Sequence, residues 1–299
     1  MSSPLSDFRP VFAPSSSTGP TLPPLAVFTK PWHEPLHALA GRMAALGVDG
    51  VELPVRPGFP VTPENVATML PEAVRVFRER GLRIFSVAGE PDAALARVCA
   101  AAGVPVIRVC LRVNDGETYP DAEARWRRRF DELRPVLDET GVCIGVQNHC
   151  GNWLPHAMAI REVCRGFAPR QVAAVWDAAH AALCGEPPAM GLDLVASHLC
   201  MVNLKNAQWV RHGGGGSRAA SGEGRDGMEV AEWKIGWCRG GEGIASWPGV
   251  AAELARRRFA GPVCLTAEYS DPTSVDRFIA EDVRLARGLL AAAYAEART

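Results

Sequence analysis

The sequence lacks an excess of charge of either sign and lacks any long apolar run. Its 32 lysine and arginine residues are balanced by 33 aspartate and glutamate residues, which gives a net charge of −1. Such a chain has no overall field that would attract nucleic acid or an anionic membrane. No apolar stretch approaches the roughly 20 residues of a membrane span, and the N-terminus does not have the basic-then-apolar order of a signal peptide. We therefore expect a cytoplasmic protein without a nucleic-acid or membrane partner.

Closely spaced cysteines and a dinucleotide-binding motif are also missing. The nine cysteines include no CxxC pair, and this spacing indicates reduced thiols rather than a metal knuckle or a disulfide framework. No GxGxxG motif follows the first apolar run, which counts against a dinucleotide-binding sheet.

What is present is the composition of one large globular domain. The chain has 299 residues, of which 47% are hydrophobic, enough to build a single substantial core. The same apolar share would permit a homo-oligomer, although no residue pattern defines an interface. Residues 1–23 are rich in serine and proline, a composition that predicts a flexible tail. We expect the folded domain to cover residues 24–299.

Eight short apolar runs alternate with longer amphipathic segments from residue 25 onward. The predicted strands are 25–29, 50–53, 83–87, 106–110, 142–147, 172–177, 200–205 and 263–268. Most are continuous apolar runs, as expected for parallel strands covered on both faces. Helices are predicted at 34–46, 63–80, 92–102, 123–140, 156–165, 247–258 and 273–292, with a weakly marked one within 187–197. Eight such units predict an α/β fold, a single (β/α)₈ TIM barrel; a doubly wound open sheet is the alternative.

One connection is much longer than the others. Residues 206–246 separate the seventh and eighth predicted strands and include four consecutive glycines at 213–216. Loops of this length are usually functional or disordered. Residues 229–237 are suited to a hairpin, so we predict a flexible tip followed by an ordered flap in this loop insertion.

Polar side chains close four neighbouring strands of the predicted barrel. Gln147, Asp177, Asn203 and Glu268 end the fifth to eighth strands. In a barrel the carboxyl ends of the strands carry the chemistry, and the alternation of side chains along a strand places all four on the inward face. Four oxygen donors on adjacent strands are suited to one hard divalent cation, Mg²⁺ or Mn²⁺, more than to Zn²⁺.

These strand ends carry a family resemblance. Together with the Asp-x-x-His at 177–180, the Asn-His at 148–149 and the Gly-Glu-Gly at 241–243, they resemble the xylose isomerase-like TIM barrels, which include sugar phosphate isomerases and epimerases. The resemblance covers about residues 25–290 and implies a sugar-like substrate. It also implies metal ligands of the types Glu, Asp, His and Glu on strands five to eight, which fall here on Gln147, Asp177, Asn203 and Glu268.

Two of the four positions depart from that pattern, since amides stand at Gln147 and Asn203. Only two formal negative charges then surround the ion, so we expect weaker metal binding and leave its occupancy open. The resemblance implies an epimerase arrangement with two glutamates on opposite faces of the substrate carbon, and Gln147 cannot accept a proton. Chemistry with one base, Glu268, and a proton shuttle such as His149 or His180 remains open.

Other polar residues near the strand ends are expected to contact substrate. Lys205 shares a face with Asn203, and Glu52 and Glu90 close the second and third strands. All three are predicted to bind substrate oxygens. Glu52 and Glu90 have a purely structural alternative, because each could pair with Arg56 or Arg108.

The sequence thus predicts a divalent-metal-dependent isomerase, epimerase or related lyase that acts on a small sugar or polyhydroxylated carbonyl compound. Glu268, His149 and His180 are the expected catalytic residues. The alternative is a catalytically lapsed barrel that binds a sugar-like ligand or a protein partner. An abasic-site endonuclease on the same fold is disfavoured because the chain lacks a basic excess.

Overall fold

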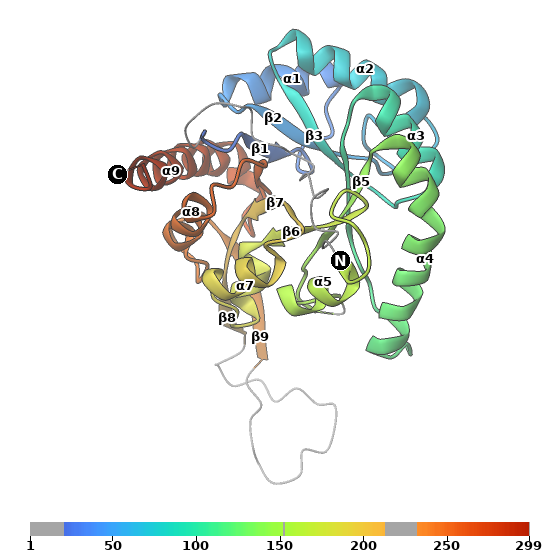
Figure 1. Ribbon diagram of the computed structural model, residues 1–299. Coiled ribbons are helices and arrows are strands. Elements are labelled where there is room, and N and C mark those ends of the chain that lie inside the picture. Colours follow the sequence, from blue (N-terminus) through green and yellow to red (C-terminus); the bar gives the residue numbers. More distant parts are fainter. Residues whose placement is uncertain (1–20, 152, 213–231, 299) are drawn as a thin grey trace, which may run out of the picture.

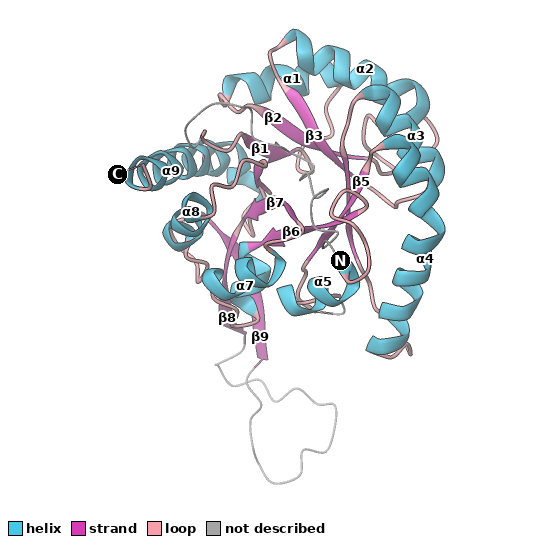
Figure 2. Ribbon diagram, viewed as in Figure 1, coloured by secondary structure: helices cyan, strands magenta, loops and turns pink. Residues whose placement is uncertain are grey.

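The computed structural model describes residues 21–151, 153–212 and 232–298. Eight parallel strands close into a barrel in the order β1-β10-β7-β6-β5-β4-β3-β2, and helices surround it (Figures 1 and 2). The barrel strands are β1 (Leu25–Phe28), β2 (Gly50–Pro54), β3 (Arg83–Ala88), β4 (Val106–Cys110), β5 (Cys143–Gln147), β6 (Val172–Asp177), β7 (Leu199–Leu204) and β10 (Val263–Leu265). The fold is therefore a (β/α)₈ barrel, as predicted, and not an open sheet.

The helices follow the strands in the order expected for this fold. They are α1 (Leu36–Ala45), α2 (Val66–Glu79), α3 (Ala93–Ala102), α4 (Tyr119–Thr140), α5 (Ala157–Cys164), α6 (Ala178–Leu183), α7 (Pro188–Val195), α8 (Trp247–Arg256) and α9 (Val275–Glu296), with a 3₁₀ turn at Pro272–Ser274. Within the described part of the chain, no helix is long and apolar enough to cross a membrane.

The barrel interior is filled by apolar side chains that alternate with the outward-facing ones. Phe85, Val106, Val175 and Met201 belong to this inner cluster. Gly145 of β5 also faces inward, because a Cβ placed there would lie 2.7 Å from Cγ2 of Val175. Side chains thus fill the barrel interior around Gly145, and the polar residues that follow the strands lie at their carboxyl ends.

The last barrel strand is shorter than predicted. β10 ends at Leu265 instead of reaching 268, and Ala267 has a positive φ of 50°. Such a backbone conformation is rare for a residue with a side chain, and it turns the chain out of the extended path. Thr266 and Glu268 consequently lie in an irregular segment at the barrel mouth.

A two-stranded antiparallel hairpin extends from the barrel. β8 (Asn206–His212) pairs with β9 (Glu232–Cys238), and in the view of Figure 1 the two strands run down together below the barrel, past the label of α7. The sequence predicted a hairpin within 229–237 alone; the structure instead pairs residues 232–238 with the start of the insertion, and residues 229–231 lie outside the described part of the chain. The predicted flexible tip at 213–216, and nearly all of the predicted tail at 1–23, lie outside the described residues.

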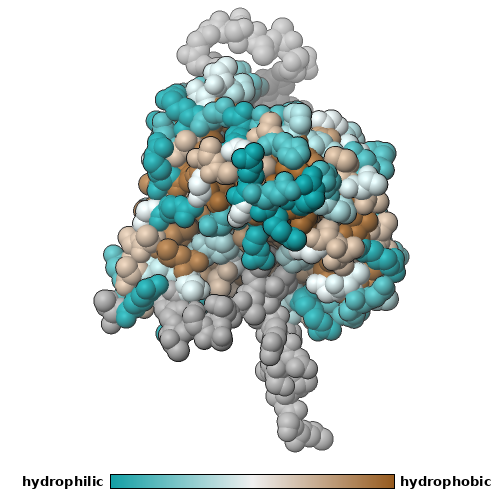
Figure 3. Space-filling model, turned by 90° about the horizontal axis from the view of Figure 1, so that it is seen from above, coloured by the Kyte–Doolittle hydropathy of each residue, from teal (hydrophilic) through white to brown (hydrophobic). Residues whose placement is uncertain are grey.

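The outer surface is mixed in polarity. On the face shown in Figure 3, hydrophilic residues are interspersed with smaller hydrophobic areas, which is ordinary for a surface in contact with water. Trp209 on β8 and Trp233 on β9 are exposed. The hairpin thus carries two large aromatic side chains away from the core.

Candidate active site

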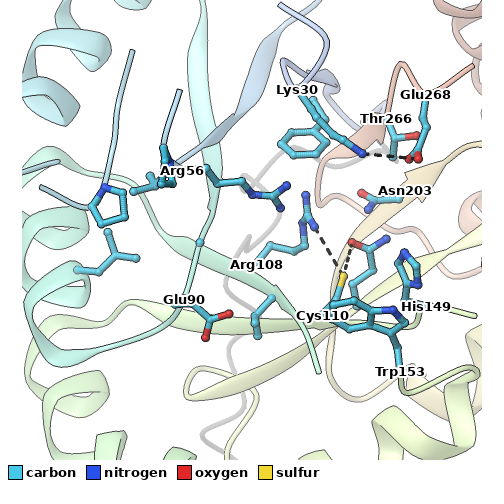
Figure 4. A pocket seen from close by; sticks show the side chains of 18 of the residues that line it. Lys30, Arg56, Glu90, Arg108, Cys110, His149, Trp153, Asn203, Thr266 and Glu268 are labelled. Atoms are coloured by element: carbon cyan, nitrogen blue, oxygen red, sulfur yellow. Dashed lines mark hydrogen bonds and ion pairs between the residues drawn. The ribbon is translucent and has the colours of Figure 1, made fainter. Parts of the chain in front are cut away.

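A pocket of about 560 Å³ opens at the carboxyl ends of the strands. This volume is within the range of small-molecule sites. Figure 4 shows side chains from several strands converging on it. Its polar lining consists of Lys30, Arg56, Glu90, Asp92, Arg108, Cys110, Gln147, His149, His180, Asn203, Lys205, Thr266 and Glu268. Of the residues predicted from the sequence, only Asp177 and Glu52 are not part of the lining.

Asp177 lies just below the pocket floor and is fully engaged by its own chain. Its Oδ1 accepts hydrogen bonds from the backbone N–H groups of Ala179 and His180, each at 3.0 Å, and so caps the N-terminus of α6. Its Oδ2 accepts the Nε2 amide hydrogen of Gln147 at 2.8 Å. Burial raises the pKa of Asp177, and the positive charge of Lys205 acts against this effect. The carboxylate therefore has a structural role that the sequence did not reveal.

Asn148 holds the ends of β5 and β6 together. Its side-chain oxygen accepts the backbone N–H of Asp177 at 2.7 Å, and its Nδ2 donates to the backbone carbonyl of Asp177 at 3.0 Å. Because Asn148 is fully buried, this pair of bonds satisfies it without a ligand. The Asn-His sequence at 148–149 thus combines a structural residue with one that lines the pocket.

Lys205 and Glu268 form the charged centre of the pocket. The Lys205 Nζ lies 3.1 Å from Oε2 of Glu268 and 2.9 Å from Nε2 of His180. It also stands 3.9 Å from the ring centroid of Trp237. On the other side, Lys30 lies 3.6 Å from Oε1 of Glu268. Burial raises the pKa of Glu268, but the two lysines outweigh it and hold that pKa below its usual value.

Two buried polar side chains beside this centre have no hydrogen-bond partner in the described chain. They are Asn203, through both its Oδ1 and its Nδ2, and Thr266, through its Oγ1. Both side chains line the pocket. A buried polar group without a partner costs free energy, so these atoms are the natural place for a ligand's hydroxyl groups to bind.

The two predicted histidines stack on each other at the same edge of the pocket. Their ring centroids are 3.9 Å apart. Burial lowers the pKa of His149 to about 4 and also lowers the pKa of His180, where Lys205 adds to the effect. Both imidazoles are therefore neutral at pH 7. The Nε2 of His180 faces the Lys205 ammonium at 2.9 Å, and its Nδ1 lies 3.3 Å from the backbone N–H of Cys150 and 3.1 Å from the Cys150 sulfur.

Glu52 and Glu90 lie in two different environments. Glu52 is fully buried: it accepts from the Ser86 hydroxyl at 2.9 Å and forms an ion pair with Arg108. It supports the pocket floor through Arg108, as the structural alternative for this residue anticipated. Glu90 stands at the pocket rim with its side chain 71% exposed, 3.8 Å from Arg129.

Lys30 and Arg56 are pocket residues that the sequence prediction missed. Lys30 and Arg56 follow the ends of the first two strands closely, so the rule that strand ends carry function would have found them. The contact between Trp237 and Lys205 was not predicted, because it depends on how β9 folds back onto the barrel.

The expected hard-cation set does not fit a divalent ion in this arrangement. Both oxygens of Asp177 accept hydrogen bonds from the protein, and each oxygen of Glu268 faces a lysine ammonium. The amides of Gln147 and Asn203 add no charge. A divalent ion would have to displace an ammonium group to reach Glu268, and hydrogen-bond donors of the chain to reach Asp177.

A second group of metal-capable side chains is present at the edge of the pocket. Ligand atoms of His149, Cys150 and His180 lie within 4.8 Å of one another. Nitrogen and sulfur donors suit zinc or copper more than magnesium or manganese. The group differs from the ligand set expected from the sequence, since it shares none of the four strand-end residues.

Comparison with known proteins decides the family. A family model described as xylose isomerase-like TIM barrel matches residues 41–289. The chain belongs to this family. No curated protein is similar enough in sequence to match.

Several solved structures have the same fold as this chain. Mannonate dehydratase from Streptococcus suis superimposes with a TM-score of 0.67 at 12% identity, over 93% of this chain and 96% of that one. D-psicose 3-epimerase from Clostridium cellulolyticum, solved with D-tagatose, gives 0.66 at 13% identity, over 89% and 99%. A probable 3-DHS dehydratase from Bacillus anthracis gives 0.65 at 11% identity, over 88% and 98%. At these identities the likeness establishes the fold, and the neighbours include sugar epimerases and dehydratases.

Proposed function

We propose that this barrel is an isomerase, epimerase or lyase that moves a proton on a small polyhydroxylated carbonyl compound. The observation that carries the proposal is Glu268, a carboxylate with a lowered pKa that lines the pocket beside the unpartnered polar atoms of Asn203 and Thr266. Such a carboxylate is ionised at neutral pH and can accept a proton. Fold-level likeness to sugar epimerases and dehydratases supports the substrate class.

The reaction we propose uses a single carboxylate base. Gln147 occupies the strand-five position, and its amide donates to Asp177, so no second base stands there. His149 lines the pocket and is neutral at pH 7, which allows it to relay a proton between substrate oxygens. This arrangement favours isomerisation or β-elimination over an epimerisation that needs two matched carboxylates.

Proton exchange tests the proposal directly. We would incubate the protein in D₂O with ketoses, inososes and keto-glycosides and follow loss of the C–H signal next to the carbonyl by NMR. We expect exchange with at least one compound and its loss in Glu268→Gln. The matched control is Glu139→Gln, which makes the same change on the exposed surface of α4, outside the pocket lining, and should retain exchange.

The outcome also separates the catalytic proposal from its alternative. Exchange that persists in a folded Glu268→Gln variant would show that another group is the base. Binding of a panel compound without exchange or conversion would favour a barrel that binds a sugar-like ligand and has lost catalysis. Thermal unfolding of both variants would confirm that they remain folded.

A further inference from the structure

We propose that the ammonium group of Lys205 takes the place of the expected divalent cation in this pocket, so that the proton transfer runs without a metal ion. The inference rests on the proposed function and names the group that would stabilise the developing negative charge. Lys205 lies two residues after Asn203 and is only 5% exposed. Its Nζ reaches Glu268, one of the four residues expected to hold the metal.

The four expected metal ligands leave one carboxylate, Glu268, for a cation to balance, and the ammonium of Lys205 already does so. Two of the four expected ligands are neutral amides, and the third, Asp177, has both oxygens occupied by hydrogen bonds from the chain. Glu268 is the remaining anion, and Lys205 balances it directly at 3.1 Å. With Lys30 at 3.6 Å from the other oxygen of Glu268, an added divalent ion would face two like charges.

The groups around Lys205 also fix the position of its ammonium group. His180 is neutral and accepts at Nε2, and the ring of Trp237 lies 3.9 Å from the ammonium, a favourable arrangement for a cation on an aromatic face. An ammonium has three N–H donors, and Glu268 and His180 use two of them. The third remains for a ligand oxygen in the pocket that Lys205 lines.

In the reaction that follows, Lys205 would donate a hydrogen bond to the substrate carbonyl oxygen. Glu268 takes the proton from the carbon next to that carbonyl; the C–H electron pair forms the C=C bond of an enediolate, and the oxygen gains the negative charge beside Lys205. Glu268 then delivers the proton to the former carbonyl carbon, while the proton of the neighbouring hydroxyl group moves to the negatively charged oxygen, which completes an isomerisation. Alternatively, the oxygen re-forms the carbonyl, the C=C electron pair forms a new double bond to the β-carbon, and the β-hydroxyl group takes the proton from Glu268 and leaves as water. No oxidant or reductant is required.

Binding of Mn²⁺ tests the inference without any need for a substrate. The full-length protein, freed of metal with a chelator, would be titrated to about 1 mM Mn²⁺ and bound ion counted by EPR. We expect no site of about one ion per chain in the wild type. One bound Mn²⁺ per chain that disappears in Glu268→Gln would overturn the inference.

Engineered variants test whether Lys205 itself is what excludes the ion. Gln147→Glu with Asn203→His restores the ligand types that the family resemblance implies. Adding Lys205→Met to this pair should tighten Mn²⁺ binding by at least about tenfold, because it removes the competing ammonium. The matched control adds Lys30→Met instead and should have a smaller effect. Equal Mn²⁺ affinity with and without Lys205→Met would contradict the inference. If the triple variant does not fold, the Mn²⁺ titration of the wild-type protein decides whether the pocket binds the ion.

The proton-exchange assay keeps this inference separate from the proposed function. Exchange that continues in EDTA and is lost in Lys205→Met supports both the proposed function and the role of Lys205. Exchange that appears only after Mn²⁺ is added would uphold the function and overturn the role of Lys205. If no compound exchanges, the function fails, and the Mn²⁺ titrations alone decide whether Lys205 stands in for the ion.

Discussion

Replacing Arg108 by methionine would leave the Glu52 carboxylate buried without its counterion. The Nε of Arg108 lies 3.0 and 3.1 Å from the two oxygens of Glu52, and its side chain is 6% exposed, against 0% for Glu52. Removing one partner of such a pair costs about 3–5 kcal/mol. For a chain of this size, that corresponds to a fall in Tm of roughly 10 °C.

Equilibrium unfolding in urea, followed by circular dichroism, would measure this loss. The double variant Glu52→Leu with Arg108→Met removes both charges and should recover most of the stability, because no unpaired charge remains. The control is Arg97→Met, which breaks an ion pair with Glu139 whose side chains are 56% and 60% exposed and should cost less than about 1 kcal/mol. The reasoning is refuted if Arg108→Met unfolds like the wild type, or if the double variant is no more stable than the single one.

Two further predictions concern stability. Gly145→Ala should destabilise the barrel by about 1–3 kcal/mol through overpacking, because the new methyl would lie 2.7 Å from Val175 and 3.0 Å from Val106. The control is Gly41→Ala in α1, where an added methyl group would meet no atom within 4 Å. This control should be neutral or stabilising in the same urea assay. Burial raises the pKa of Asp282 to about 6, so the folded state holds its proton more tightly than the unfolded chain does. Stability should therefore fall by about 3 kcal/mol as pH rises from about 4 to about 6. Asp282→Asn should remove this slope, and an unchanged slope would contradict the assignment.

The order of the elements was predictable from sequence because each depends on local pattern. The continuous apolar runs at 106–110 and 172–177 became β4 and β6 with the predicted bounds. Helix α6 was not predicted, because its six residues follow a strand directly and their only start signal is the capping by Asp177. The strand that pairs with residues 232–238 was also not predicted, because pairing across a long insertion depends on the whole fold rather than on neighbours in the chain.

In the candidate site, too, the features that depend on local sequence were predictable and those that depend on long-range contacts were not. The strand-end rule brought Gln147, Asn203 and Glu268 to one pocket, and the structure places all three there. Their partners were not predictable, because the contact between Lys205 and Glu268 joins residues 63 positions apart. Which oxygens stay free for a ligand depends on such contacts, and they decide whether the pocket suits a metal ion.

Deuterium exchange in the presence of EDTA is the most direct test of the central claim, that Glu268 and Lys205 together move a proton on a carbonyl compound. We predict that the wild-type protein exchanges the proton next to the carbonyl of at least one ketose, inosose or keto-glycoside in EDTA. We also predict that Glu268→Gln and Lys205→Met each abolish this exchange while remaining folded. Exchange that EDTA eliminates and Mn²⁺ restores would contradict the account.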